Sequence, residues 1–342
     1  MKHIKHLTAL ALTLIMVFSL TACGSSGASS AAASASAAAS SSEEDAVTIR
    51  AAALKGPTAM GLVKLMNDAD SGDTTYGTYD FTIAAAADEI TPALIQGELD
   101  VACVPANLAA VLYNKTQGGI TTLAINTLGV LYIVENGNAV QSLADLKGQT
   151  IVASGKGSTP EYALRYLLSE NGLDPDTDVV IDWKSEHSEC VSALASGAAT
   201  IALLPQPFVT VAQSKLTDLR IALDLTEEWA KLDNGSSLLT GVVIARSEFA
   251  QEHPAAIEAF LEGYADSVSY VNSNTADAAQ LIGDYGIVDA AVAEKALPYC
   301  NITCVTGSDM KTQLSGYLAV LHEQNPESVG GSLPNDDFYY GA

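Results

Sequence analysis

Short apolar runs alternate with longer amphipathic segments through the first two thirds of this chain. Six runs have the length of β-strands, and each is followed by a stretch with helical periodicity. Because short runs that are apolar throughout are typical of strands buried on both faces, the pattern predicts mostly parallel sheets covered by helices. The expected strands are residues 47–54, 81–86, 99–104, 150–154, 179–183 and 201–204.

The last third of the chain has a different pattern. A short apolar run at 241–244 is followed by segments with mainly helical periodicity. These segments are residues 248–271, 275–284, 289–297 and 308–323. The predicted fold class is therefore α/β with a helical C-terminal part.

Two motifs occur twice, about one hundred residues apart. Lys55-Gly56-Pro57-Thr58 follows the first expected strand, and Lys156-Gly157-Ser158-Thr159 follows a later one. Residues 93–105 also align with residues 193–205, with five of the thirteen positions identical. In each copy a glycine ends a helix, an apolar strand follows, and a proline opens the next helix. The repeat predicts two similar α/β lobes.

The N-terminal segment differs in composition from the rest. Two lysines precede an apolar run at 7–20, which is shorter than the roughly 20 residues that cross a bilayer. This layout predicts a secretory signal peptide over residues 1–22. The sequence Leu20-Thr21-Ala22-Cys23 resembles the bacterial lipobox, so Cys23 is the expected lipidation site. Residues 23–45, rich in Gly, Ala and Ser, are expected to form a flexible tether.

The charge of the mature chain excludes some classes of partner. The signal peptide contains two of the 16 basic residues and none of the 40 acidic ones, which leaves a formal charge of −26. A protein this acidic is not expected to bind nucleic acid or anionic membrane surfaces. Since the chain shows neither a coiled-coil heptad nor a long apolar surface stripe, it is expected to be a monomer.

Residues that carry metal or catalytic chemistry are sparse. The mature chain has only His187, His253 and His322, no two of them at metal-ligand spacing, so no metal site is predicted. We interpret His187 as part of a helix cap with neighbouring acids. The chain contains no nucleophile elbow, P-loop or obvious acid/base pair, so neither an enzyme nor a cofactor is expected. Cys300 and Cys304 can pair only if the chain turns between them, because in a continuous strand they lie about 13 Å apart.

Two strand-to-helix loops, the Lys-Gly-x-Thr repeats, carry the first candidate binding residues. In parallel α/β sheets, ligands bind beyond the carboxyl ends of the strands. Each loop combines a lysine, hydroxyls and free backbone N–H groups at a helix start, which suits a carboxylate, sulfonate or phosphate. Ser158 and Glu161 also have the spacing of a capping box. The alternative is that the glycines and serines are ordinary turn residues and the lysines are solvated.

A second pair of turns adds further binding chemistry. Asn107 and Gln206 offer amide donors and acceptors, and Trp183 and Phe208 offer an apolar or stacking wall, although each aromatic residue is equally suited to the core. Because equivalent strand ends of two similar lobes point at a shared space, we expect the loops to face one cleft. The candidate ligand-binding residues are Lys55, Gly56, Pro57, Thr58, Pro105, Asn107, Lys156, Gly157, Ser158, Thr159, Trp183, Gln206 and Phe208.

The lipobox, the tether and three motifs resemble the solute-binding lipoproteins of ABC importers. The motifs are Lys55-Gly56-Pro57-Thr58, residues 96–102 and residues 146–151. Within this group the chain is most similar to the branch that handles nitrate, sulfonates, taurine and thiamine-precursor pyrimidines. The resemblance covers residues 46–342 and implies a fold like the type II periplasmic binding proteins, with the ligand between two lobes joined by two crossovers. The implied boundaries are 46–130 plus 241–342 for lobe one and 131–240 for lobe two.

The resemblance implies a receptor on the outer face of the bacterial cytoplasmic membrane, held there only by its lipid. Such a receptor captures a small molecule and delivers it to an ABC permease with a cytoplasmic ATPase. The lysines at the expected strand ends favour an anionic or zwitterionic organic ligand. Two alternatives are an exported enzyme and a ligand sensor built on the same fold.

Overall fold

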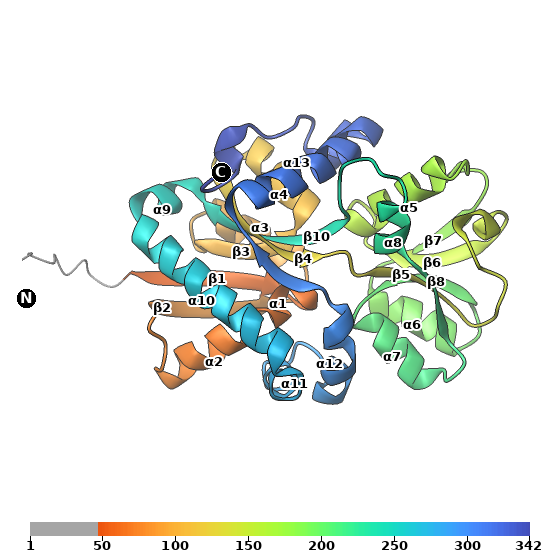
Figure 1. Ribbon diagram of the computed structural model, residues 1–342, viewed down its shortest axis with the longest axis horizontal. Coiled ribbons are helices and arrows are strands. Elements are labelled where there is room, and N and C mark those ends of the chain that lie inside the picture. Colours follow the sequence, from red (N-terminus) through yellow and green to blue (C-terminus); the bar gives the residue numbers. More distant parts are fainter. Residues whose placement is uncertain (1–46) are drawn as a thin grey trace, which may run out of the picture. The chain divides into compact units, whose positions relative to one another are not determined.

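The structure is a computed structural model that describes residues 47–342 (Figure 1). The predicted signal peptide, Cys23 and the tether lie outside the described residues. Strands and helices alternate up to residue 246, and helices dominate after it, so the predicted α/β class with a helical C-terminal part is confirmed. Within residues 47–342, none of the helices has the length and apolar character that crossing a bilayer would need.

Two separate β-sheets organise the described chain, and we call each sheet with its helices a lobe. The sheet of lobe one has the strand order β11-β4-β10-β3-β1-β2. Strand β1 pairs in parallel with β2 and β3, whereas β10 runs antiparallel to β3 and β4, and β11 runs antiparallel to β4. The strands are β1 (Thr48–Leu54), β2 (Thr78–Ala84), β3 (Val101–Pro105), β4 (Ile120–Leu128), β10 (Leu239–Arg246) and β11 (Ile302–Val305).

The sheet of lobe two has the order β7-β6-β8-β5-β9. Strand β6 pairs in parallel with β7 and β8, and β5 runs antiparallel to β8 and β9. The strands are β5 (Leu131–Glu135), β6 (Thr150–Ser154), β7 (Val180–Lys184), β8 (Ile201–Pro205) and β9 (Arg220–Asp224). We keep the implied lobe boundaries, 46–130 plus 241–342 and 131–240, as a proposal.

Both sheets are mixed rather than mostly parallel, which corrects that part of the prediction. Four of the nine strand pairings are parallel and five are antiparallel. The reason is that β5 and β10 enter each sheet from the other lobe and run against its βα units. The hydrophobic pattern did not indicate β4, β5, β9 or β11. Only Gly129 and Val130 separate β4 from β5, and β11 has four residues.

Helices cover both faces of each sheet. In lobe one, alternate residues of β1 face opposite cores: Ala51 packs with residues of α2 and α10, and Ala52 packs with residues of α3 and α4. In lobe two, Ile151 faces α5, whereas Val152 faces α6 and α7. The helices of the first part of the chain are α1 (Pro57–Met60), α2 (Val63–Ser71), α3 (Ala87–Ile95), α4 (Ala106–Lys115), α5 (Thr159–Glu170), α6 (His187–Ala195), α7 (Phe208–Lys215) and α8 (Leu225–Ala230).

The C-terminal part is helical, and the expected helix at 248–271 is divided in two. Pro254 occupies the first turn of the second helix, where its missing N–H is tolerated, so the division falls at His253. The helices are α9 (Ser247–Glu252), α10 (Pro254–Ser273), α11 (Thr275–Asp284), α12 (Ala290–Ala296) and α13 (Gly307–Gln324), with a short 3-10 helix η2 (Leu297–Tyr299) after α12.

The internal repeat corresponds to a structural repeat. The order β1-α1-α2-β2-α3-β3-α4 of lobe one parallels β6-α5-β7-α6-β8-α7 of lobe two. Gly97 and Gly197, which end α3 and α6, both have positive φ angles, of 76° and 74°. This left-handed conformation is the usual reason for a glycine at the end of a helix. The prediction of two similar α/β units is confirmed.

The chain crosses between the lobes twice (Figure 1). The first crossover is residues 129–130, and the second, residues 225–238, contains α8. Trp229 of α8 is fully buried, and its Nε1 donates to Ser236 Oγ at 2.9 Å. Its ring centroid lies 4.7 Å from that of Tyr166 in α5 and 5.6 Å from that of Tyr317 in α13. The second crossover is therefore packed against both lobes.

Cys300 and Cys304 are free thiols, so the disulfide considered from the sequence is not formed. Cys304 lies in the extended strand β11, and Cys300 ends the 3-10 helix before it. Burial raises the pKa of the Cys300 thiol to about 12 and that of the Cys304 thiol to about 11. Both groups are therefore protonated and weakly reactive near neutral pH.

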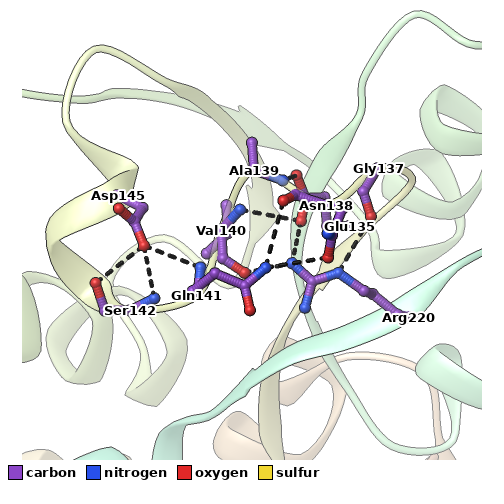
Figure 2. Close-up of polar contacts among 9 residues, drawn as sticks. All are labelled: Glu135, Gly137, Asn138, Ala139, Val140, Gln141, Ser142, Asp145 and Arg220. Atoms are coloured by element: carbon purple, nitrogen blue, oxygen red, sulfur yellow. Dashed lines mark hydrogen bonds and ion pairs between the residues drawn. The ribbon is translucent and has the colours of Figure 1, made fainter.

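A buried carboxylate fixes the loop after β5 (Figure 2). Glu135 is 3% exposed and accepts hydrogen bonds from the backbone N–H groups of Ala139 and Val140, at 2.7 and 3.2 Å. Arg220 of β9 pairs with the same carboxylate and donates from Nε to the Gly137 carbonyl at 3.1 Å. Burial alone would raise the pKa of Glu135, but the hydrogen bonds from the backbone and Arg220 outweigh it, and the pKa is lowered.

We predict that Glu135→Gln lowers the free energy of unfolding by about 1.5–3 kcal/mol near neutral pH, the range for hydrogen bonds to a charged group. A lowered carboxyl pKa stabilises the fold above the unfolded value of about 4.3, and the contribution is lost as the pH falls through the folded value. Urea titrations of both proteins at neutral and acidic pH measure the difference, which should shrink in acid.

Asp145→Asn is the control for Glu135→Gln. The Asp145 carboxylate is exposed and caps a 3-10 turn through the N–H groups of Gln141 and Ser142, each at 2.9 Å (Figure 2). Replacing Asp145 should lower the free energy of unfolding by less than replacing the buried Glu135 does. If the two variants lose equal free energy of unfolding, the buried ion pair of Glu135 stabilises the fold no more than an exposed capping carboxylate does.

Candidate ligand-binding cleft

A cavity of about 140 Å³ lies between the lobes, at the carboxyl ends of β1 and β3 in lobe one and of β8 in lobe two. The first crossover and the start of β10 complete its wall. Because both lobes and a crossover contribute, a molecule in this cleft contacts both lobes at once. The sixteen lining residues are Leu54, Lys55, Gly56, Pro57, Thr58, Pro105, Val130, Leu131, Ser158, Thr159, Pro160, His187, Pro205, Gln206, Phe208 and Thr240.

The structure brings nine of the thirteen candidate ligand-binding residues together in this cleft. Both Lys-Gly-x-Thr loops reach it, so the loops of the two lobes face each other as the repeat suggested. The nine residues are Lys55, Gly56, Pro57, Thr58, Pro105, Ser158, Thr159, Gln206 and Phe208.

Four candidates lie outside the cleft lining. Lys156 and Gly157 are exposed at the turn of their loop, and Trp183 packs against the core. Asn107 is buried beside the cleft, where its Nδ2 donates to the Ser328 carbonyl at 3.2 Å. Its Oδ1 accepts from Thr159 Oγ1 at 3.5 Å, so Asn107 links the two lobes.

The loop before α5 differs from the expected capping box. The Glu161 carboxylate accepts from the N–H of Gly157 at 2.6 Å, and the Ser158 hydroxyl makes no capping hydrogen bond. Gly155 and Gly157 both have positive φ angles, and the resulting turn brings the Gly157 N–H to Glu161. The Ser158 side chain therefore lines the cleft beside the N-terminus of a helix of twelve residues.

The loop after β1 is held tightly to its strand. Thr58 Oγ1 donates to the Leu54 carbonyl at 2.8 Å, and the backbone N–H of Lys55 donates to the Ala84 carbonyl at 2.9 Å. Gly56 has a φ of 124°, a conformation that favours glycine. The main chain of this loop is fixed, while the Lys55 side chain stays exposed at the edge of the cleft.

His187 lines the cleft, although the sequence suggested only a cap. The cap is made by Glu189, whose carboxylate accepts from the N–H groups of Ser185 and Glu186 at 2.8 and 3.3 Å. The imidazole is left free to hydrogen-bond through Nδ1 with the Ser154 hydroxyl. Burial lowers the pKa of His187 to about 4, so the ring is neutral near pH 7.

The repeat contained the signal for His187, because position 187 aligns with Ala87 at the start of α3 and so lies at an equivalent strand-to-helix turn. Thr240 was missed because β10 begins at residue 239, before the apolar run at 241–244. Among residues 47–342, no group of three or more His, Cys, Asp or Glu side chains is arranged to hold a metal ion.

Residues 74–294 match the sequence model of a family described as ABC transporter, phosphonate, periplasmic substrate-binding protein. The chain belongs to this family. No curated protein sequence matches the chain. The match confirms the resemblance to ABC solute-binding proteins and assigns the chain to substrate binding outside the cytoplasm.

Solved structures of other proteins have the same fold as this ABC substrate-binding protein. An ABC transporter protein from Parabacteroides distasonis is 22% identical, with a TM-score of 0.71 over 85% of this chain and 98% of that one. The aliphatic sulphonate binding protein SsuA of Escherichia coli is 17% identical, with a TM-score of 0.67 over 85% and 95%. The nitrate-binding protein NrtA of Synechocystis is 12% identical, with a TM-score of 0.55 over 72% and 69%. The predicted type II periplasmic-binding-protein fold is confirmed.

We predict that the His187 ring of this ABC substrate-binding protein titrates near pH 4, because the half-buried ring is poorly solvated in the cleft wall. Because the unfolded chain takes up the proton first, near pH 6.5, protonation favours unfolding and stability falls as the pH drops between these values. NMR of the ring protons measures the midpoint, with His187→Asn assigning the signal. A midpoint near 6.5 would mean that the ring is solvated rather than buried in the cleft wall.

Proposed function

We propose that this protein is a lipid-anchored receptor that binds a small anionic or zwitterionic organic molecule between its lobes and delivers it to an ABC permease. The observation that carries the proposal is the cleft itself, which residues of both lobes and a crossover line together. A ligand that contacts both lobes favours the closed arrangement by its difference in affinity for the closed and open states. The permease can then distinguish the loaded receptor from the empty one.

The chemistry of the cleft supports an anionic group on the ligand. Ser158 and Thr159 lie at the N-terminus of α5, where the helix dipole and backbone N–H groups favour negative charge. Lys55 contributes a positive charge from lobe one. The family description names phosphonate, and the solved relatives include proteins named for sulphonate and nitrate, all of them oxyanions.

We propose that the protein has no enzymatic role. The hydrogen-bonded pair of Ser154 and His187 is the feature nearest to catalytic chemistry. However, Ser154 is 2% exposed and is not part of the cleft lining, so its hydroxyl is shielded from a bound ligand by the residues that line the cleft. The pair is better suited to holding the imidazole in place than to nucleophilic attack.

We propose the mode of membrane attachment from the N-terminal sequence. Residues 1–22 act as the signal peptide, Cys23 carries the lipid, and residues 23–45 form the tether. The tether lets the receptor reach its permease on the outer face of the cytoplasmic membrane. We propose that the receptor is a monomer that uses no cofactor and binds no nucleic acid.

We predict that Lys55→Ala weakens the binding of alkylsulfonates and alkylphosphonates by about 0.5–1.5 kcal/mol, the net contribution of one hydrogen bond. The effect should decrease with added salt, because Lys55 is exposed. Lys156→Ala is the matched control, since Lys156 belongs to the equivalent loop but lies outside the cleft lining.

Isothermal titration calorimetry of the three proteins with one set of probes measures these effects. If Lys156→Ala loses more affinity than Lys55→Ala, the anion does not bind in the cleft that Lys55 lines. If both variants bind like the wild type, the anionic group contacts neither lysine, and the argument from charge fails.

We predict that Cys23→Ser, once its signal peptide is removed, moves the protein from the membrane fraction to the soluble extracytoplasmic fraction. The reason is that the two or three acyl chains on this residue are the proposed anchor, and together they give the stable binding that a single chain cannot. Fractionation and immunoblotting measure the distribution. Retention in the membrane fraction of variant protein that has lost its signal peptide would point to a different anchor.

A further inference from the structure

The cleft lining contains no acidic side chain, although the chain has 40 Asp and Glu residues. Among the sixteen lining residues, Lys55 carries the only full charge near neutral pH, because His187 is neutral there. Glu294 and Lys295 line a neighbouring cavity of about 570 Å³, not the cleft. An ammonium group entering the cleft would therefore meet no carboxylate to replace its hydration.

The Gln206 carboxamide has one fixed orientation. Its side chain is 1% exposed, and its Oε1 accepts two hydrogen bonds from Thr210, at 3.3 Å from the backbone N and 2.9 Å from Oγ1. The Thr210 hydroxyl can donate or accept, but a flipped amide would place Nε2 against the backbone N–H of Thr210, which cannot accept, so that contact assigns the orientation. Nε2 donates to no protein atom in the described part of the chain, and Gln206 borders both the cleft and the neighbouring cavity.

Thr240 lies at the start of β10, in the six-stranded sheet, and is the counterpart of Gln206, which follows β8 of the five-stranded sheet. Its Oγ1 is buried, lacks a hydrogen-bond partner among the described residues, and belongs to a residue that lines the cleft. Gln206 lies at the same end of the cleft as the crossovers, since its backbone N–H donates to the Val130 carbonyl at 3.0 Å. Buried polar atoms without partners are rare in folded proteins, and in a cleft they indicate where a ligand binds.

We infer that Gln206 and Thr240 form a polar subsite at the crossover end of the cleft that takes a hydrogen-bond acceptor of the ligand and excludes ligands with an ammonium group. This inference rests on the proposed function and narrows it from anionic or zwitterionic molecules to anions without an amine. Gln206 offers only N–H donors, and Thr240 can donate as well. An amine placed there would face donors on one side and the positive charge of Lys55 elsewhere in the cleft.

Matched pairs of probes test the inference on the wild-type protein. The pairs are ethanesulfonate with 2-aminoethanesulfonate, and ethylphosphonate with 2-aminoethylphosphonate. The two members of a pair share the anionic group and differ in the amine. We expect calorimetry to give about tenfold or tighter binding for the amine-free member of each pair, the effect expected from one unpaired charged donor.

Gln206→Glu puts a carboxylate in the same place and tests the residue itself. It should reduce or invert the preference, because the amine gains a partner while the amine-free anion loses a donor. Gln213→Glu is the control: it makes the same charge change seven residues later, within α7, at a residue that lines the neighbouring cavity and not the cleft. The control should keep the wild-type preference. Thr240→Val should weaken binding of the amine-free probes about fivefold, the equivalent of one hydrogen bond.

The outcomes separate this inference from the proposed function. Binding of both members of a pair with equal affinity, or tighter binding of the amine, overturns the inference and leaves the anion receptor standing. A wild-type preference that Gln206→Glu and Gln213→Glu change equally overturns the assignment to Gln206. If no probe of either pair binds, the anionic ligand class itself is wrong, and both proposals fall.

Discussion

The exchange of strands between the two sheets is the constraint on which the rest of the structure depends. Strand β10 lies beside β3, and β5 lies beside β8, so each lobe is completed by a strand from the other side of a crossover. The crossovers also contact each other, because a Cβ at Gly129 would lie 2.1 Å from Thr226 Oγ1. Asn301 Nδ2 then holds the Gly129 carbonyl at 2.6 Å. In the proposed receptor, two packed crossovers would form a common hinge region about which the lobes open and close.

The parts of the fold that local patterns determine could be predicted from the sequence. The βα units of both lobes follow from apolar runs, glycine caps and prolines, and the aligned segments 93–105 and 193–205 gave their duplication. The exchanged strand β5 could not be recognised, because its direction depends on a sheet completed by β8 and β9 rather than on its own residues. Hydrophobic periodicity indicates that a strand is buried but contains no information about which neighbour it pairs with.

The sequence predicted those parts of the candidate site that lie at the ends of parallel strands. The loops at 55–58 and 155–159 reach the cleft because each connects a parallel strand to the helix that follows it. Which side chain of a loop enters the cleft depends on turn geometry that the sequence does not specify. The positive φ angles of Gly155 and Gly157 leave Lys156 in solvent, whereas the capping role of Glu189 frees His187 to face the cleft.

The aromatic cluster on the second crossover gives the molecule a built-in optical reporter. Trp229 lies between Tyr166 of one lobe and Tyr317 of the other, and the chain's only other tryptophan, Trp183, is on β7 in lobe two. Indole emission depends on the packing and polarity around the ring, so a change in the angle between the lobes alters the signal of Trp229 more than that of Trp183. Domain motions occur in microseconds to milliseconds, and rapid-mixing fluorescence can follow them in the unlabelled protein.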